Sequence, residues 1–220
     1  MKTDMQLHQD VLAELTWDPQ LYESGQDIGV GANDGVVTLA GSVASYAEKL
    51  AAEHAAERVG GVKAVVNNLV VNIPSSMAHS DAELAQRLVK ALMWDIEVPN
   101  DTIKAAIANG WVTLEGEAEW QFQRDAAARV ARNLTGVRGV TNNIKVIAKG
   151  VSSSVVSRGI KEALERRADR TAANIIVDAK DGVVTLTGSV PSFGERRAAE
   201  GAAWSAPGVT EVRDALAVVF

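Results

Sequence analysis

The chain has 220 residues, of which 47% are hydrophobic and 23% are charged, and it contains no cysteine, which excludes disulfides, thiolate metal sites and cysteine nucleophiles. The net charge of −6 comes entirely from residues 1–78, which hold 4 Lys and Arg against 10 Asp and Glu. Residues 79–150 hold 9 basic and 9 acidic residues, and so do residues 151–220. Nucleic acid is therefore disfavoured as a partner, because binding to phosphates needs a basic face.

The chain opens with a predicted amphipathic helix. Val11, Leu12 and Leu15 recur at helical spacing and form one apolar stripe. Asp4 or Asp10 is the expected N-cap of this helix.

The same helical pattern returns twice further along the chain. Leu84, Leu88 and Leu92 are spaced four residues apart. They follow Ser80 and Glu83, whose spacing is typical of a capping box. A third stripe, preceded by serines at 152–154, is formed by Val156, Ile160 and Leu164.

A β-hairpin is predicted after the first helix. Ile28 and Val30 alternate before an Asp-Gly pair, and Val37 and Leu39 alternate after it. Asp-Gly and Asn-Gly pairs favour two-residue turns with positive φ. We assign structural roles to two sets of glycines. The turn glycines are Gly35, Gly110 and Gly182, and those expected to end the second strand are Gly41, Gly116 and Gly188.

An alanine-rich helix and a third strand complete the unit. The helix is expected over residues 46–59, 122–134 and 193–206. Its expected C-caps are Gly60-Gly61, Gly136 and Gly208. The third strand contains the alternating apolar residues Val65, Leu69 and Val71, then Val140, Ile144 and Val146, then Val212, Leu216 and Val218. The strand–helix–strand crossover predicts that this strand runs parallel to the second.

These elements form a unit that is repeated three times. The segment 33–41 returns at 108–116 and 180–188, so its glycines step by 75 and then 72 residues. We expect three tandem domains: copy one at 1–73, copy two at 79–148 and copy three at 152–220. The predicted class is α+β, with α-β-β-α-β order, a three-stranded mixed sheet and two helices on one face of it. Repetition of this kind favours multivalent binding.

The repeated motif resembles the BON domain family. The matching features are Asn/Asp-Gly-Val-Val-Thr-Leu-x-Gly-x-Val-x-Ser, the alanine-rich helix and Gly-Val-x-x-Val-x-Asn-x-Leu. Copy one carries them in full at 34–45 and 61–69, whereas copy two has Trp111 for the first valine and copy three has Asp214 in place of Asn67 and Asn142. The resemblance covers roughly residues 5 to 219. It implies a non-catalytic α/β module that interacts with phospholipid or with the bacterial envelope.

Two tryptophans are the first candidate binding residues. Trp17 and Trp94 both end a first helix, and copy three has Arg166 at the equivalent position. An amphipathic indole suits a lipid headgroup region. The alternative is a lid over the end of the sheet or a contact between copies.

A basic helix in copy three is the second candidate. Its residues could meet anionic lipid, or they could form a solvated face with pairs such as Glu162–Arg166. The basic candidates are Arg158, Lys161, Arg166, Arg167 and Arg170.

No catalytic or metal-binding pattern recurs in the copies. The three histidines His8, His54 and His79 have no ligand spacing, and Gly29-Val30-Gly31 is not a dinucleotide fingerprint. Asn67-Asn68 and Asn142-Asn143 are expected to satisfy sheet edges or local turns. We therefore expect no enzyme activity, no cofactor and no metal.

The sequence leaves two main functional hypotheses. The first is a multivalent protein that binds anionic phospholipid or an envelope protein, with a role in osmotic stress. The second is a cytosolic scaffold or self-assembling module, favoured by the acidic first copy. A small apolar ligand between copies is a weaker third hypothesis.

No stretch approaches the ~18–20 apolar residues of a membrane span, and no signal sequence precedes the first repeat. We expect a cytoplasmic location for the chain as given, or a periplasmic one if a leader has been removed.

Overall fold

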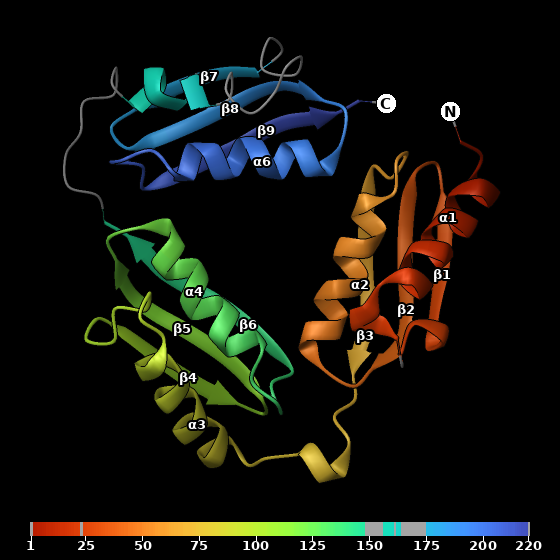
Figure 1. Ribbon diagram of the computed structural model, residues 1–220, viewed down its shortest axis with the longest axis horizontal. Helices are drawn as coiled ribbons and strands as arrows, with labels where there is room; N and C mark the ends of the chain where they lie inside the picture. Colours follow the sequence, from red (N-terminus) through yellow and green to blue (C-terminus); the bar gives the residue numbers. More distant parts are fainter. Residues whose placement is uncertain (1, 23, 148–155, 161, 164–174, 220) are drawn as a thin grey trace. The chain divides into compact units, whose positions relative to one another are not determined.

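A computed structural model describes residues 2–22, 24–147, 156–160, 162–163 and 175–219 (Figure 1). Within these residues the chain forms three three-stranded sheets, ordered β1-β2-β3, β4-β5-β6 and β7-β8-β9. Each belongs to one copy of the repeat, and the predicted α+β class is confirmed.

The element order follows the predicted unit. Copy one contains α1 (Asp4–Trp17), β1 (Ile28–Asn33), β2 (Val36–Val43), α2 (Tyr46–Arg58) and β3 (Ala64–Val71). Copy two contains α3 (Asp81–Trp94), β4 (Ile103–Ala108), β5 (Trp111–Ala118), α4 (Gln121–Arg132) and β6 (Gly139–Val146). Copy three contains β7 (Ile175–Lys180), β8 (Val183–Val190), α6 (Phe193–Trp204) and β9 (Glu211–Val218). Residues 156–160 and 162–163 are also helical, and short 3-10 helices span Pro19–Leu21, Gly25–Asp27 and Ser75–Met77.

The strand directions confirm the crossover prediction. In copy one β1 pairs antiparallel with β2, and β2 pairs parallel with β3. Copy three repeats this arrangement with β7, β8 and β9. In copy one α1 contacts β1, α2 contacts β2 and β3, and the two helices contact each other over one face of the sheet (Figure 1). Among the described residues of copy one, no helix lies on the opposite face of that sheet.

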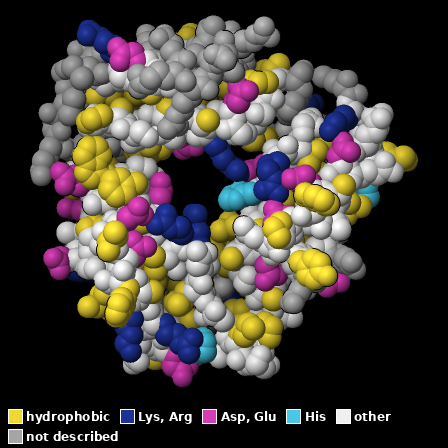
Figure 2. Space-filling model, in the orientation of Figure 1, with side chains coloured by type: hydrophobic (Ala, Val, Ile, Leu, Met, Phe, Trp, Pro, Cys, Tyr) yellow, Lys and Arg dark blue, Asp and Glu magenta, His cyan; other side chains and the backbone are white. Residues whose placement is uncertain are grey.

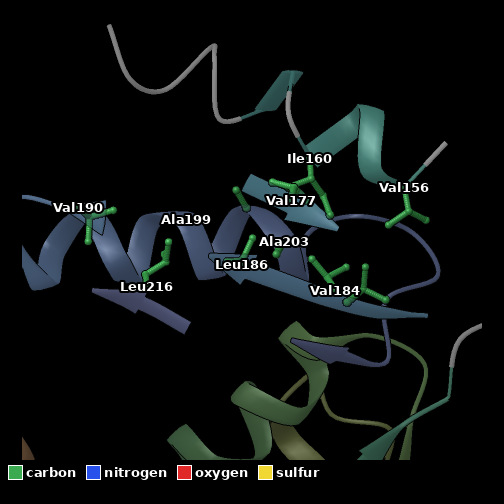
Figure 3. Packing of buried hydrophobic residues seen from close by; sticks show 11 residues of the cluster. Val156, Ile160, Val177, Val184, Leu186, Val190, Ala199, Ala203 and Leu216 are labelled. Carbon is green, nitrogen blue, oxygen red and sulfur yellow. The ribbon is translucent and has the colours of Figure 1, made fainter. Parts of the chain in front are cut away.

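The core of each copy lies between helices and sheet. In copy three, Val156 and Ile160 pack with residues of the β-sheet and of α6 (Figure 3). The helix contributes small side chains such as Ala199 and Ala203, which allow close approach, and the strands contribute Val184 and Leu186. Leu164, expected on the same stripe, lies outside the described residues.

The first helix differs from the prediction at its start and in its stripe. Thr3, rather than Asp4 or Asp10, is the N-cap: its hydroxyl accepts from the Gln6 backbone N–H, and Gln6 Oε1 accepts from the Thr3 N–H. The buried residues are Leu7, Val11 and Leu15, four residues apart, while Leu12 is only half-buried. The predicted capping box of Ser80 and Glu83 is present at the start of α3.

The glycines have two different roles. Gly35, Gly110 and Gly182 occupy the hairpin turns with φ of 85°, 77° and 81°. The second set, expected to end a strand, instead lies inside β2, β5 and β8, at Gly41, Gly116 and Gly188. At Gly41, φ is +125°, and a Cβ would lie 2.5 Å from the carbonyl oxygen of Asp27. The absence of a side chain therefore lets the segment that enters β1 pass close to the strand.

In copies one and three the glycines after the second helix are also not its C-caps, since the C-cap of α6 is Ser205. The C-cap of α2 is Val59, in an extended conformation, and Gly61 (φ +103°) lies in the turn that follows.

Candidate functional site

The two helix-end tryptophans, Trp17 and Trp94, point away from the core. They are the last residues of α1 and α3, and their side chains are 86% and 85% exposed. At 3.6 residues per turn, a residue two positions after the buried Leu15 or Leu92 faces the opposite side of the helix. A lid over the sheet would bury these rings, so that alternative is wrong.

Further exposed apolar side chains lie near the tryptophan of copy two in the sequence. Met93 is 65% exposed and Ile96 is fully exposed. Val89 is also exposed and lies four residues before Met93, on the same side of α3. We call Val89, Met93, Trp94 and Ile96 the α3-end patch. Sequence reasoning did not single out Val89, Met93 or Ile96. The signal that could have identified them is that they are apolar and lie outside the buried stripe of α3.

The tryptophan of copy one has a different setting. Tyr22 is 85% exposed a short distance along the chain. Trp17 also borders a hollow of about 470 Å³ that is lined by Lys2, Asp10, Ala13, Glu14, Val59 and Gly60. This hollow has charged groups of both signs, and Lys2 and Asp10 form an ion pair of 2.6 Å.

An ion pair holds the tryptophan-bearing end of α1 against α2. Asp18, the residue after Trp17, is the C-cap of α1, and its Oδ2 accepts from Arg58 Nη2 at 2.7 Å. Arg58 Nε also donates to Glu14 Oε1 at 2.7 Å. Because Arg58 ends α2, this pair fixes the helix end from which the indole projects.

The same ion pair sets the ionisation of its members. Burial acts to raise the pKa of Asp18, but the hydrogen bonds from Arg58 and from the Gln20 backbone N–H outweigh it, so the pKa lies below its ordinary value. Hydrogen bonds to Glu14 and Asp18 raise the pKa of Arg58. Both partners are therefore charged at neutral pH.

Copy two has a corresponding ion pair from a different position of the second helix. Asp95 follows Trp94 as Asp18 follows Trp17, and it lies 3.8 Å from Arg129 Nη2. Arg129 also pairs with Glu97 at 2.6 Å. By the 75-residue step, Arg129 corresponds to His54, one helical turn before Arg58.

The basic helix of copy three is described at one position only. Arg158 is exposed. The other four predicted residues, Lys161, Arg166, Arg167 and Arg170, lie outside the described residues. On the face drawn in Figure 2, Lys and Arg side chains of the described residues are interspersed with Asp and Glu side chains.

Trp111, by contrast, is held against the bare face of its sheet. Its Nε1 donates to Thr141 Oγ1 at 2.8 Å, and the ring lies over Gly139, where any Cβ would collide with it. Half of its surface is exposed. It is therefore a packed tryptophan and differs from the helix-end tryptophans.

The described residues offer neither a metal cluster nor a membrane-crossing helix. No group of three or more His, Asp or Glu among them could hold a metal ion. None of the described helices is both long and apolar enough to span a bilayer.

Comparison with known proteins gives matches along most of the chain. A family model for the BON domain matches residues 3–73, 80–148 and 152–219. The chain is 32% identical over 123 residues to Osmotically-inducible protein Y of Escherichia coli (strain K12), and this match covers 54% of the chain but only 61% of that protein. It is 33% identical over 146 residues to the 21 kDa hemolysin of Actinobacillus pleuropneumoniae, covering 66% of the chain and 73% of that protein.

Among solved structures, CdsD, a structural protein of the type III secretion system of Chlamydia trachomatis, is similar at 17% identity with a TM-score of 0.28. That match covers 96% of this chain and 91% of the solved chain.

Proposed function

Given that the chain belongs to the BON domain family, we propose that it is a non-enzymatic, multivalent protein that binds phospholipid surfaces of the cell envelope. The observation that carries the proposal is the exposure of Trp17 and Trp94 at the same position of two copies, with side chains 86% and 85% exposed. Large aromatic rings are seldom left this open unless they meet another surface.

The chemistry of the exposed groups suits a headgroup region. Indole has an apolar body and an N–H donor, which is why tryptophan collects at membrane–water interfaces. In the α3-end patch, Met93 and Ile96 add aliphatic surface beside Trp94. Such a patch can enter the boundary between headgroups and acyl chains without crossing the bilayer.

The distribution of charge favours copy two as the copy that contributes most to binding an anionic surface. Copy one holds the whole net charge of −6, so an anionic surface repels it. Copy two is electrically balanced and carries the larger apolar patch. Arg158 and the other basic residues of copy three add attraction of about 1 kcal/mol for each residue near the surface. Linked weak sites of this kind raise overall binding roughly 10²–10⁴-fold.

A role in osmotic stress is part of the proposal. It rests on the similarity to a relative that is named as osmotically inducible. We expect the amount of this protein in its native cell to rise when external osmolarity is raised, as quantitative immunoblotting would measure. If the amount does not change, the expression of this protein is not induced by osmolarity and this part of the proposal fails.

Vesicle co-sedimentation of the full chain tests the lipid proposal. The chain should pellet with vesicles that contain phosphatidylglycerol more than with phosphatidylcholine vesicles, and high salt should weaken the binding. The double variant Trp17→Ala/Trp94→Ala should lower the bound fraction about tenfold, because both apolar anchors are lost. Arg166→Glu/Arg167→Glu/Arg170→Glu should remove most of the salt-dependent part.

Trp111→Phe is the matched control, because it changes a tryptophan outside the proposed site. It should bind vesicles as the wild type does. If the wild type pellets with neither vesicle at either salt concentration, the lipid proposal fails and a protein scaffold becomes the better explanation. Equal loss in the control and in the double variant would contradict the assignment to the helix ends.

A further inference from the structure

The sheet of copy one contains no charged residue. None of the residues of β1, β2 and β3 is Asp, Glu, Lys or Arg, although copy one carries the whole net charge of the chain. The equivalent strands of the other copies are charged. Those of copy two contain Lys104, Glu115, Glu117 and Lys145, and those of copy three contain Asp178, Lys180, Glu211, Arg213 and Asp214.

Charge on edge strands normally prevents association. An edge strand presents unpaired N–H and C=O groups, and proteins protect it with charged side chains, proline or bulges. The order β1-β2-β3 makes β1 and β3 the two edges of the copy-one sheet (Figure 1). β1 has the sequence Ile-Gly-Val-Gly-Ala-Asn, with neither charge nor proline.

The β3 edge is closed by side chains. The Leu69 N–H donates to Asn67 Oδ1 at 3.2 Å, and the Leu69 carbonyl accepts from Lys49 Nζ at 2.7 Å. Asn67 is itself held by its donation to the Lys49 carbonyl at 2.9 Å. Copy three uses the same device, since the Leu216 N–H donates to Asp214 Oδ1 at 2.9 Å. A strand added at β3 would have to displace these bonds.

The β1 edge has no such closure. The two-residue turn places Asn33 opposite Val36, and hydrogen-bonded pairs alternate along an antiparallel ladder from that point. Ile28, Val30 and Ala32 therefore direct their N–H and C=O groups away from β2. Among the described residues, no side chain bonds to these groups. Gly29 and Gly31 are exposed on the bare face and carry no side chain that could obstruct a neighbour.

We propose that β1 pairs antiparallel with β1 of a second copy of this chain. The strand is self-complementary about a twofold axis at Val30. Ile28 of each chain then forms backbone hydrogen bonds with Ala32 of the other chain. Two chains of net charge −6 repel each other, so an uncharged strand is the element through which they can approach. The contact is a small one, which places it among weak, reversible interfaces.

The proposal does not depend on lipid binding. The helix-end tryptophans lie on α1 and α3, whereas the pairing uses the backbone of β1. Variants in β1 and variants at the tryptophans therefore report on different surfaces, and either proposal can fail while the other stands.

The geometry allows a charge test. About the Val30 axis, Gly29 faces Gly31 of the other chain in a non-hydrogen-bonded pair, where side chains come closest. A Cβ at Gly29 would lie 3.5 Å from the Ala40 carbonyl oxygen, and one at Gly31 would lie 3.9 Å from Thr38 Cβ, so both sites accept a side chain. Copy two carries Lys104 at the position equivalent to Gly29, and copy three carries Asp178 at the position equivalent to Gly31.

Sedimentation equilibrium of the full chain, run without lipid at low salt, measures the association. The wild type should form a dimer as its concentration is raised. Gly29→Lys/Gly31→Lys places like charges opposite each other twice and should weaken the dimer about tenfold or more. Gly29→Lys/Gly31→Asp places opposite charges together and should keep the dimer. Amide exchange at Ile28, Val30 and Ala32 should slow as the wild type dimerises.

Ile176→Lys is the matched control, since Ile176 is exposed at the equivalent position of β7. It should leave association unchanged, and all variants should keep the wild-type thermal transition. A chain that stays monomeric across the concentration series would overturn the proposal. So would a dimer that tolerates Gly29→Lys/Gly31→Lys, or a monomer that instead accepts an added peptide strand at β1.

Discussion

Asp18 joins several functions in a single side chain. It ends α1, its Oδ1 accepts from the Gln20 N–H at 3.0 Å to start the following 3-10 helix, and its Oδ2 pairs with Arg58. The carboxylate is nearly buried, with 10% of the side chain exposed, whereas Arg58 is 48% exposed. Solvent therefore screens the pair, and its contribution to stability is modest.

Replacement of this carboxylate by an amide isolates its charge. Asp18→Asn keeps a group that can cap the 3-10 helix but weakens the bond to Arg58, so we expect the free energy of unfolding of copy one to fall by about 1 kcal/mol at neutral pH. Native-state amide exchange of the copy-one residues in increasing denaturant would measure it. Arg58→Gln in the same background should add only the loss of the remaining bond from Arg58 Nε to Glu14.

The effect of Asp18 should also depend on pH. Its folded-state pKa lies below the ordinary value of 3.8, so the stabilisation is fully present above that value. It is lost as the pH falls through the folded-state pKa. The difference between wild type and Asp18→Asn should therefore be constant from neutral pH to about pH 5, shrink below the ordinary value and vanish in stronger acid. A difference that grew on acidification would contradict the assignment.

Other single residues show where sequence reasoning stopped. The period of Gly41, Gly116 and Gly188 was visible in the sequence, but their role was not, because the close contact involves a residue 14 positions away in the chain. The sequence-based expectation that Asn67 satisfies a sheet edge is confirmed by its bond to the Leu69 N–H. The strand order was needed to show that Asn67 lies on the β3 edge and that β1 forms the other edge of the sheet.

At the scale of whole elements, periodicity predicted most of the fold. The alternation in the strands and the four-residue spacing of Leu84, Leu88 and Leu92 were sufficient, because the three leucines are buried and the alternating strand residues are buried or half-buried. The predicted stripe of α1 contained Leu12 and omitted Leu7, which lies in the first turn, because the two alternative N-caps, Asp4 and Asp10, left the start of the helix open. Three residues of the α3-end patch were missed because they lie outside the buried stripe of α3. Their positions therefore do not recur at helical spacing with the stripe.

The start of α1 provides a direct test of the corrected cap. Thr3→Ala removes the hydroxyl that accepts from the Gln6 N–H, and we expect a loss of about 1 kcal/mol in the free energy of unfolding. Asp4→Ala should have a smaller effect, because Asp4 contributes only favourable charge in the first turn of the helix. Urea denaturation of both variants would decide. A larger loss for Asp4→Ala would restore Asp4 as the cap.

At the scale of the whole molecule, the copies share a fold but not a surface. Two copies end their first helix in an exposed tryptophan, and the third has Arg166 at that position. Copy one is acidic with an uncharged sheet, and the other two are balanced with charged sheets. The sequence revealed the charge of each copy, but the uncharged sheet became visible only with exact strand bounds. The domain ranges 1–73, 79–148 and 152–220 stay a prediction.

These differences suit the copies to different functions, namely pairing of two chains and binding of lipid. If β1 pairs two chains, each assembly carries twice the number of helix-end tryptophans, and a weak interface becomes effective where the protein is concentrated on a surface. Lipid binding would then promote pairing, and pairing would strengthen lipid binding by the same factor.

The two arginine pairs carry information about the history of the chain. The carboxylates Asp18 and Asp95 occupy equivalent positions, but Arg58 and Arg129 come from positions one helical turn apart. An ancestral unit that passed on a complete pair would have left both partners in register. The arginines of at least one copy have therefore changed since the ancestral unit was duplicated, by gain or by loss, while the acidic residue beside the tryptophan has a basic partner in both copies.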